Sequence, residues 1–164
     1  MQPRHFDLLP EDHEANVLFG WFIEEGGELG IVHNEAKARK LCELCNVYAP
    51  NECYEVLEAV DGDQPPRLGG EFLGYDISQG LNNSLLWSGL NTKIVNEYDD
   101  PVYILANTIY MLFGAQLNNR GLFSGIDMAT HCRQSLIALR ALKPNFIEGG
   151  DLNAFRVVAL YRLP

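Results

Sequence analysis

The stretches Phe155-Arg-Val-Val-Ala-Leu-Tyr161 and Glu71-Phe-Leu-Gly-Tyr-Asp-Ile77 decide the fold class, because both predict β-strands in a chain that also predicts helices. Another strand is predicted over Tyr54 to Val60, which ends at a turn-forming Asp-Gly-Asp. A first strand is expected over Asn16 to Glu24, which is dense in β-branched and aromatic residues and stops before a Gly-Gly turn. These strands favour a sheet.

Three helices are predicted from their start signals. Asn34 is an expected N-cap for a helix over residues 35–47, and Asp99-Asp100-Pro101 is a strong helix start. The apolar residues that follow over 102–113 recur at helical spacing, which predicts a buried central helix. Ser124 with Asp127 has capping-box spacing, which predicts the start of the third helix.

The two halves of the chain share a pattern at an offset of 91 residues. Gly30-Ile31-Val32 precedes the helix at 35, and Gly121-Leu122-Phe123 precedes the helix at 126. Each helix then leads to a predicted strand. We therefore expect one α+β domain over 1–164, with an antiparallel or mixed sheet, helices packed on it and a strand-helix-strand duplication as an open alternative. Any flexibility is expected in residues 1–14.

The charge is strongly acidic and uneven along the chain. The net charge is −10, and residues 1–100 hold 19 Asp/Glu against 6 Lys/Arg. Such a surface repels phosphate backbones, so nucleic acid is a disfavoured partner and a cationic protein a favoured one. Good solubility is the simpler explanation of the same charge. No export signal or membrane-spanning segment is predicted, so reduced thiols and a cytoplasmic location are expected.

The residues that suggest catalysis have simpler structural explanations. Cys42 and Cys45 form a Cys-x-x-Cys, but they lie late in a predicted helix rather than at its N-terminus, so core packing is expected for at least one. His131 and Cys132 are sequence neighbours, which point about 100° apart on a helix. No nucleotide-binding, hydrolase or zinc-protease motif occurs. No catalytic residue, metal or cofactor is expected.

Acidic residues at turns and strand ends are the predicted contacts for a cationic partner. Charge would steer association, and exposed aromatic residues would supply affinity. The predicted contacts are Glu24, Glu25, Asp61, Asp63, Glu71, Asp76 and Glu97.

The strand at 71–77 after a Pro/Gly loop and the closing strand at 155–161, in a small acidic domain, resemble the cytoplasmic immunity proteins that bacteria encode beside polymorphic toxins. The resemblance implies a non-enzymatic inhibitor that binds a toxin domain and covers its active site. The toxin could be a nuclease, a deaminase, an NAD-degrading enzyme or another type. Two alternatives stay open: a small cytosolic enzyme that uses Cys132, His131 or a carboxylate near Asp76, and a homo-oligomeric structural subunit.

Overall fold

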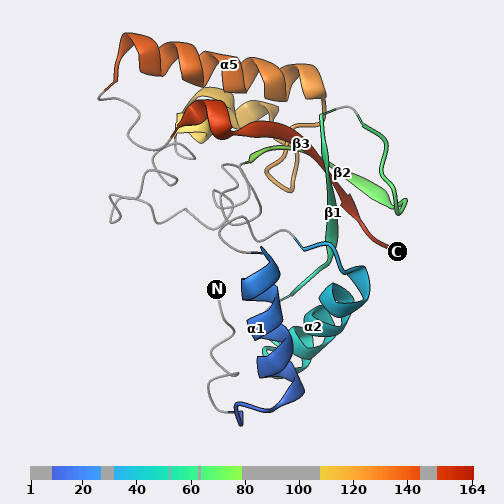
Figure 1. Ribbon diagram of the computed structural model, residues 1–164. Coiled ribbons are helices and arrows are strands. Elements are labelled where there is room, and N and C mark those ends of the chain that lie inside the picture. The colour runs from blue at the N-terminus through green and yellow to red at the C-terminus, as the bar shows by residue number, and fades with distance from the viewer. Residues whose placement is uncertain (1–8, 27–31, 52, 63, 79–107, 145–150) are drawn as a thin grey trace. The chain divides into compact units, whose positions relative to one another are not determined.

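The computed structural model describes residues 9–26, 32–51, 53–62, 64–78, 108–144 and 151–164 (Figure 1). Its contacts divide the chain into two compact units, Met1–Val56 and Leu57–Pro164, called here the helical unit and the sheet unit. Helices and an antiparallel sheet are both present, so the α+β class is confirmed. A single domain over the whole chain stays a prediction.

The helical unit consists of α1 (Glu14–Gly26) and α2 (Glu35–Tyr48). The strand predicted over residues 16–24 is therefore wrong. Ala15, Leu18, Phe19 and Phe22 recur at helical spacing, and they pack in one cluster with Leu41 and Cys45 of α2. A strand would place alternate residues on opposite faces, whereas a helix puts this whole set on one side. Burial against α2 overrides the strand propensity of the individual residues.

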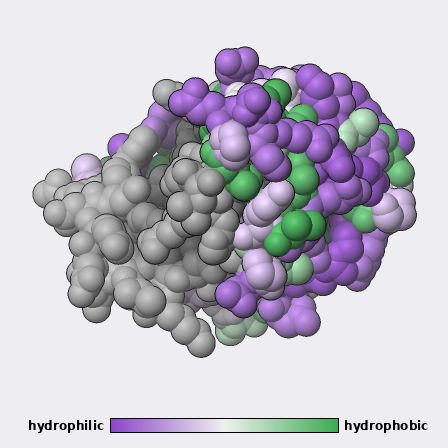
Figure 2. Space-filling view, turned by 90° about the horizontal axis from the view of Figure 1, so that it is seen from below, coloured by the Kyte–Doolittle hydropathy of each residue, from purple (hydrophilic) through white to green (hydrophobic). Residues whose placement is uncertain are grey.

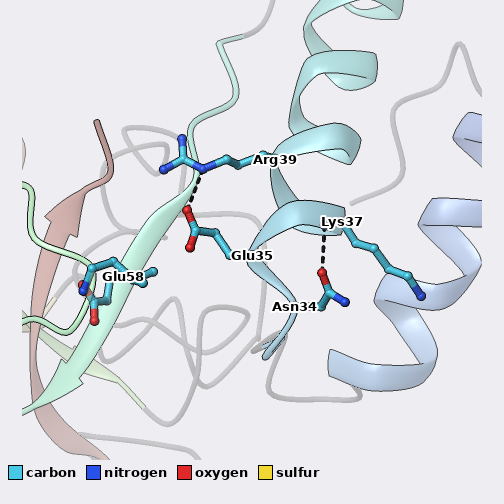
Figure 3. A network of polar contacts seen from close by, with 6 residues as sticks. Asn34, Glu35, Lys37, Arg39 and Glu58 are labelled. Atoms are coloured by element: carbon cyan, nitrogen blue, oxygen red, sulfur yellow. Dashed lines mark hydrogen bonds and ion pairs between the residues drawn. The ribbon is translucent and has the colours of Figure 1, made fainter.

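Side chains satisfy the backbone at the start of both helices. Nδ1 of His13 accepts a hydrogen bond from the N–H of Ala15 at 3.2 Å, and Nε2 of His13 lies 3.2 Å from the hydroxyl of Tyr48. The predicted N-cap of α2 is confirmed, since Oδ1 of Asn34 accepts from the N–H of Lys37 at 3.0 Å (Figure 3). One turn later, Arg39 and Glu35 form an ion pair at 2.7 Å (Figure 3).

The sheet unit holds three antiparallel strands in the order β1-β3-β2. These are β1 (Leu57–Asp61), β2 (Glu71–Ser78) and β3 (Arg156–Arg162), so the three strands predicted in this part of the chain are confirmed to within a few residues. β1 starts later than predicted, because the side chain of Asn46 binds both the N–H and the carbonyl of Tyr54.

Gly74 is a point of very close packing in the sheet unit. It follows a register shift in β2 and has a φ of +144°, which side chains rarely adopt. A Cβ at this position would lie 2.6 Å from Cβ of Leu122 and 2.9 Å from the carbonyl oxygen of Phe123. The next residue, Tyr75, exchanges two backbone hydrogen bonds with Phe123. This close approach attaches the 117–123 segment to the outer edge of β2.

Helix α5 (Ile126–Leu142) packs against β2 and β3 (Figure 1). Its buried side chains, Ala129, Cys132 and Leu136, join the main hydrophobic core. The predicted capping box is wrong: Gly125 is the N-cap and makes no side-chain capping bond. Short 3-10 turns, η5 (Gly114–Gln116) and η6 (Leu152–Ala154), precede α5 and β3.

The predicted central helix is described only over residues 108–113, which are helical. Ile109 is fully buried in the main core and Phe113 packs against it, whereas Met111 and Leu112 are exposed. The predicted start at 99–101 lies outside the described residues.

The two helices compared at an offset of 91 residues begin at Glu35 and Ile126, as the offset requires. Their buried residues also correspond, because Leu41 and Cys45 match Cys132 and Leu136. The first extended step, at residues 30–31, lies outside the described part of the chain, so duplication stays a prediction.

Gly74→Ala should lower the free energy of unfolding by about 3 kcal/mol, because the new Cβ meets backbone and the backbone conformation is strained. Gly20→Ala is the control, since no described atom lies within 4 Å of a Cβ there. Replacing this exposed helical glycine should stabilise the protein by about 0.5–1 kcal/mol. Denaturant titration of both variants measures the two effects; equal effects would contradict the assigned packing at Gly74.

Candidate partner-binding surface

The outer face of α1, formed by Val17, Gly20, Ile23 and Glu24, is an exposed apolar surface with an acidic end. Val17 is 57% exposed and Ile23 is 52% exposed. At about 100° per residue, Gly20 lies between these two side chains and nearly opposite the side that packs on α2. No described atom lies within 4 Å of the position of a Cβ at Gly20. A partner could therefore approach the helix backbone closely at this point.

An amphipathic helix normally places polar residues on the face turned away from its core, and α1 does not do so over this stretch. The described surface in Figure 2 is mostly hydrophilic, and its hydrophobic residues gather in patches between hydrophilic areas. Single exposed hydrophobic residues are ordinary. Two of them beside an open glycine on one helix face form a candidate contact surface.

Glu24 and Glu25, two of the predicted contacts, lie exposed at the C-terminal end of α1. Oε1 of Glu25 accepts a hydrogen bond from the N–H of His33 at 2.8 Å, which anchors the residues before α2. The ammonium group of Lys37 lies 5.0 Å from the centre of the Trp21 ring, on the same unit. The outer face of α1 thus ends in carboxylates.

The negative charge is concentrated in the helical unit. Residues 1–56 hold eleven Asp/Glu and four Lys/Arg, a net charge of −7, whereas residues 57–164 hold eleven and eight, a net charge of −3. The negative charge per residue is therefore higher in the helical unit than in the sheet unit.

Two acidic residues of the sheet unit form ion pairs with arginines of β3. Asp61 forms an ion pair with Arg156 at 3.1 Å, and Glu71 forms one with Arg162 at 2.9 Å. The two pairs lie toward opposite ends of β3, so Asp61 and Glu71 do not form one rim. A partner that used either carboxylate would compete with an arginine.

The remaining predicted contacts are buried or not described. Asp76 is 1% exposed, and its Oδ1 accepts from the N–H of Ile77 at 2.7 Å, so this carboxylate is not part of the described surface. Asp63 and Glu97 lie outside the described residues. Of the seven predicted contacts, the structure places Glu24 and Glu25 together beside an exposed apolar face.

An aromatic cluster on the sheet went unpredicted. The ring of Phe72, which is 41% exposed, lies 5.0 Å from the ring of Tyr75 and 5.4 Å from that of Tyr161. The alternation of side chains along a strand predicts which residues of that strand share a face, but it does not predict which residues of a neighbouring strand lie beside them. Only the β2–β3 register, which pairs Phe72 with Tyr161, brings the rings together.

The sulfur of Cys132 is unsuited to nucleophilic catalysis. Cys132 is fully buried, and its burial raises the pKa of the thiol to about 12. His131 is exposed, and its ring contacts Phe113 at a centroid distance of 6.0 Å. The thiolate needed for attack is therefore scarce at neutral pH.

The expectation that at least one cysteine of the Cys-x-x-Cys packs in a core is confirmed, because Cys45 is 6% exposed within the helical cluster.

Two buried polar residues lie at the end of β2. Asp76 and Ser78 are nearly inaccessible, and Tyr110 lies close to the Asp76 charge. Burial raises the pKa of the Tyr110 hydroxyl, and the negative charge of Asp76 raises it further. A buried carboxylate near a tyrosine is an arrangement that suits proton transfer.

Among the described residues, no group of three or more His, Cys, Asp or Glu side chains is arranged to hold a metal ion. The same part of the chain contains no helix of sufficient length and apolar character to cross a membrane.

Cysteine reactivity should follow burial. At pH 8 we expect a maleimide to label Cys53 quickly and to leave Cys132 unlabelled until the protein unfolds, because Cys53 is exposed and the pKa of Cys132 is about 12. Mass spectrometry of the labelled peptides measures this order. Fast labelling of Cys132 in the folded protein would contradict its described burial.

Comparison of the chain with protein-family models, with curated proteins and with solved structures gave no match in any of the three.

Proposed function

We propose that this protein is a non-enzymatic binding protein whose helical unit recognises a cationic partner protein through the outer face of α1. The observation that carries the proposal is the exposed Val17–Gly20–Ile23 surface on a unit with a net charge of −7. Apolar side chains at the centre of an interface supply most of its affinity, whereas surrounding charges increase the association rate and select the partner.

The paired carboxylates of the sheet unit contribute less to the attraction of a cationic partner than Glu24 and Glu25 of α1. Asp61 and Glu71 already balance Arg156 and Arg162, so their charges contribute less to the field at a distance. Glu24 and Glu25 have no arginine or lysine partner among the described ion pairs, and they flank the apolar face. Steering by charge should therefore depend on Glu24 and Glu25 more than on the sheet.

As a finer proposal, the partner is a bacterial toxin domain and the chain is its cytoplasmic immunity protein. A toxin that acts on nucleic acid presents Lys and Arg to phosphate groups. An acidic binder with an apolar contact face fits such a surface and would exclude the substrate by covering it. The acidic charge and the exposed α1 face support this assignment.

A small enzyme is the second candidate, favoured by the buried Asp76 beside Tyr110. Asp76→Asn separates the two functions, because it removes the candidate proton-transfer group without altering the outer face of α1. Loss of a catalytic activity with unchanged partner binding would favour the enzyme.

The partner is sought by pull-down of the tagged protein from its native cells at low and high salt, with mass spectrometry of the bound proteins. We expect one stoichiometric basic protein, retained less well at high salt because screening weakens the attraction between exposed charges. Inhibition of that protein's activity by the purified chain then tests the toxin assignment. An acidic or neutral partner would contradict the charge argument.

Variants of the charged residues and variants of the apolar residues should change different rate constants of binding to that partner. Glu24→Lys with Glu25→Lys should lower the association rate about tenfold and flatten its salt dependence. Val17→Ser with Ile23→Ser should instead raise the dissociation rate, with an affinity loss of about tenfold to a hundredfold.

Val47→Ser is the matched control, since Val47 is 67% exposed on α2 of the same unit but is not part of the outer face of α1. Its affinity should stay unchanged. If the control and the α1 variants lost affinity equally, the contact surface would not be the outer face of α1.

A further inference from the structure

Cys42 of α2 contacts the backbone of the segment that begins at Cys53. The side chain of Asn46 holds Tyr54 by both backbone groups, accepting from its N–H at 2.9 Å and donating to its carbonyl at 3.0 Å. Sγ of Cys42 donates to the same carbonyl at 3.1 Å. Cys53 directly precedes Tyr54, so its Cα is about 3.8 Å from the Cα of the clamped residue. Cys42 therefore contacts, and Cys53 directly precedes, the same clamped residue.

The electrostatics of Cys42 agree with this placement. Burial raises the pKa of the Cys42 thiol above its ordinary value of 9.0, the hydrogen bond from Asn46 lowers it, and the nearby Cys53 thiolate raises it again. Cys53 is exposed and open to reagents, whereas Cys42 is half-buried beneath the returning segment. The pair thus combines an accessible sulfur with a sheltered one.

We propose that Cys42 and Cys53 form an oxidisable dithiol site that closes to an intramolecular disulfide when the protein meets a disulfide oxidant such as oxidised glutathione. The bond would tie the segment that leads into β1 to α2. This site is independent of the proposed partner surface, because neither cysteine is part of the outer face of α1.

The reaction proceeds in two thiol–disulfide exchanges. The Cys53 thiolate attacks oxidised glutathione, forming a mixed disulfide and releasing one glutathione thiolate. The Cys42 thiolate then attacks Sγ of Cys53 and releases the second glutathione. Two protein thiols lose two electrons and two protons, and one oxidised glutathione becomes two reduced glutathiones.

Cys45 is the competing sulfur, three residues after Cys42 on the same helix. It is 6% exposed and packs in the helical cluster with Ala15 and Leu41. Pairing it with Cys42 would withdraw a buried side chain from that cluster. Cys132 is fully buried in the core of the other unit.

The test treats the reduced, folded chain with oxidised glutathione, blocks residual thiols with iodoacetamide and maps the linkage by mass spectrometry. A protease that cleaves after glutamate separates the three candidate cysteines, because Glu43, Glu52 and Glu55 lie between and after them. We expect the peptide ending at Glu43 to be joined to the peptide 53–55. A Cys42–Cys45 link, a persistent glutathione adduct at Cys53 or an unmodified chain would each overturn the proposal.

Variants then assign the roles of the two sulfurs. Cys42→Ser should trap the glutathione adduct on Cys53, Cys53→Ser should abolish closure, and Cys45→Ser should leave the Cys42–Cys53 bond unchanged. The rate at which the adduct closes should rise with pH, because Cys42 attacks as a thiolate. A closure rate that does not change with pH would contradict attack by Cys42.

Discussion

The hydrogen-bonded pairing of β3 with both other strands is the constraint on which the sheet unit depends. Within the described sheet, β1 and β2 each pair with β3 and not with one another. The central strand is separated from both neighbours by more than 70 residues, so the sheet forms only after a long segment has been closed, which favours slow folding. β3 also carries Arg156 and Arg162, which balance Asp61 and Glu71 on its neighbours. The same strand therefore organises the fold and reduces the free negative charge of the sheet unit.

The sequence was sufficient for elements whose local signals agree with their packing. α2 has a true N-cap at Asn34, and β2 and β3 combine strand-forming residues with adjacent turns. α1 was mispredicted because its β-branched and aromatic residues favour a strand, while contact with α2 favours a helix. The capping box at Ser124 was also misleading, because the helix begins one residue later, at a glycine N-cap without a side-chain bond.

Predicting the candidate site was harder than predicting the elements, because charge alone does not show which carboxylates are already paired. Asp61, Glu71 and Glu24 are equivalent in the sequence, but two of them face arginines that come from the far end of the chain. The burial of Asp76 also depends on tertiary contacts. The exposed face of α1 could not be predicted at all while that segment was expected to be a strand.

The proposed function joins an apolar contact face and a negative field in one helical unit, and the proposed dithiol site lies on the segment that leaves this unit. Hydrogen exchange of the protein, alone and bound to the basic protein isolated with it, tests the central claim most directly. Amide exchange reports which backbone segments become protected in the complex. The account predicts new protection centred on residues 17–24 of α1. Protection confined to β2 and β3, with α1 unchanged, would contradict it and would move the contact to the aromatic cluster around Phe72.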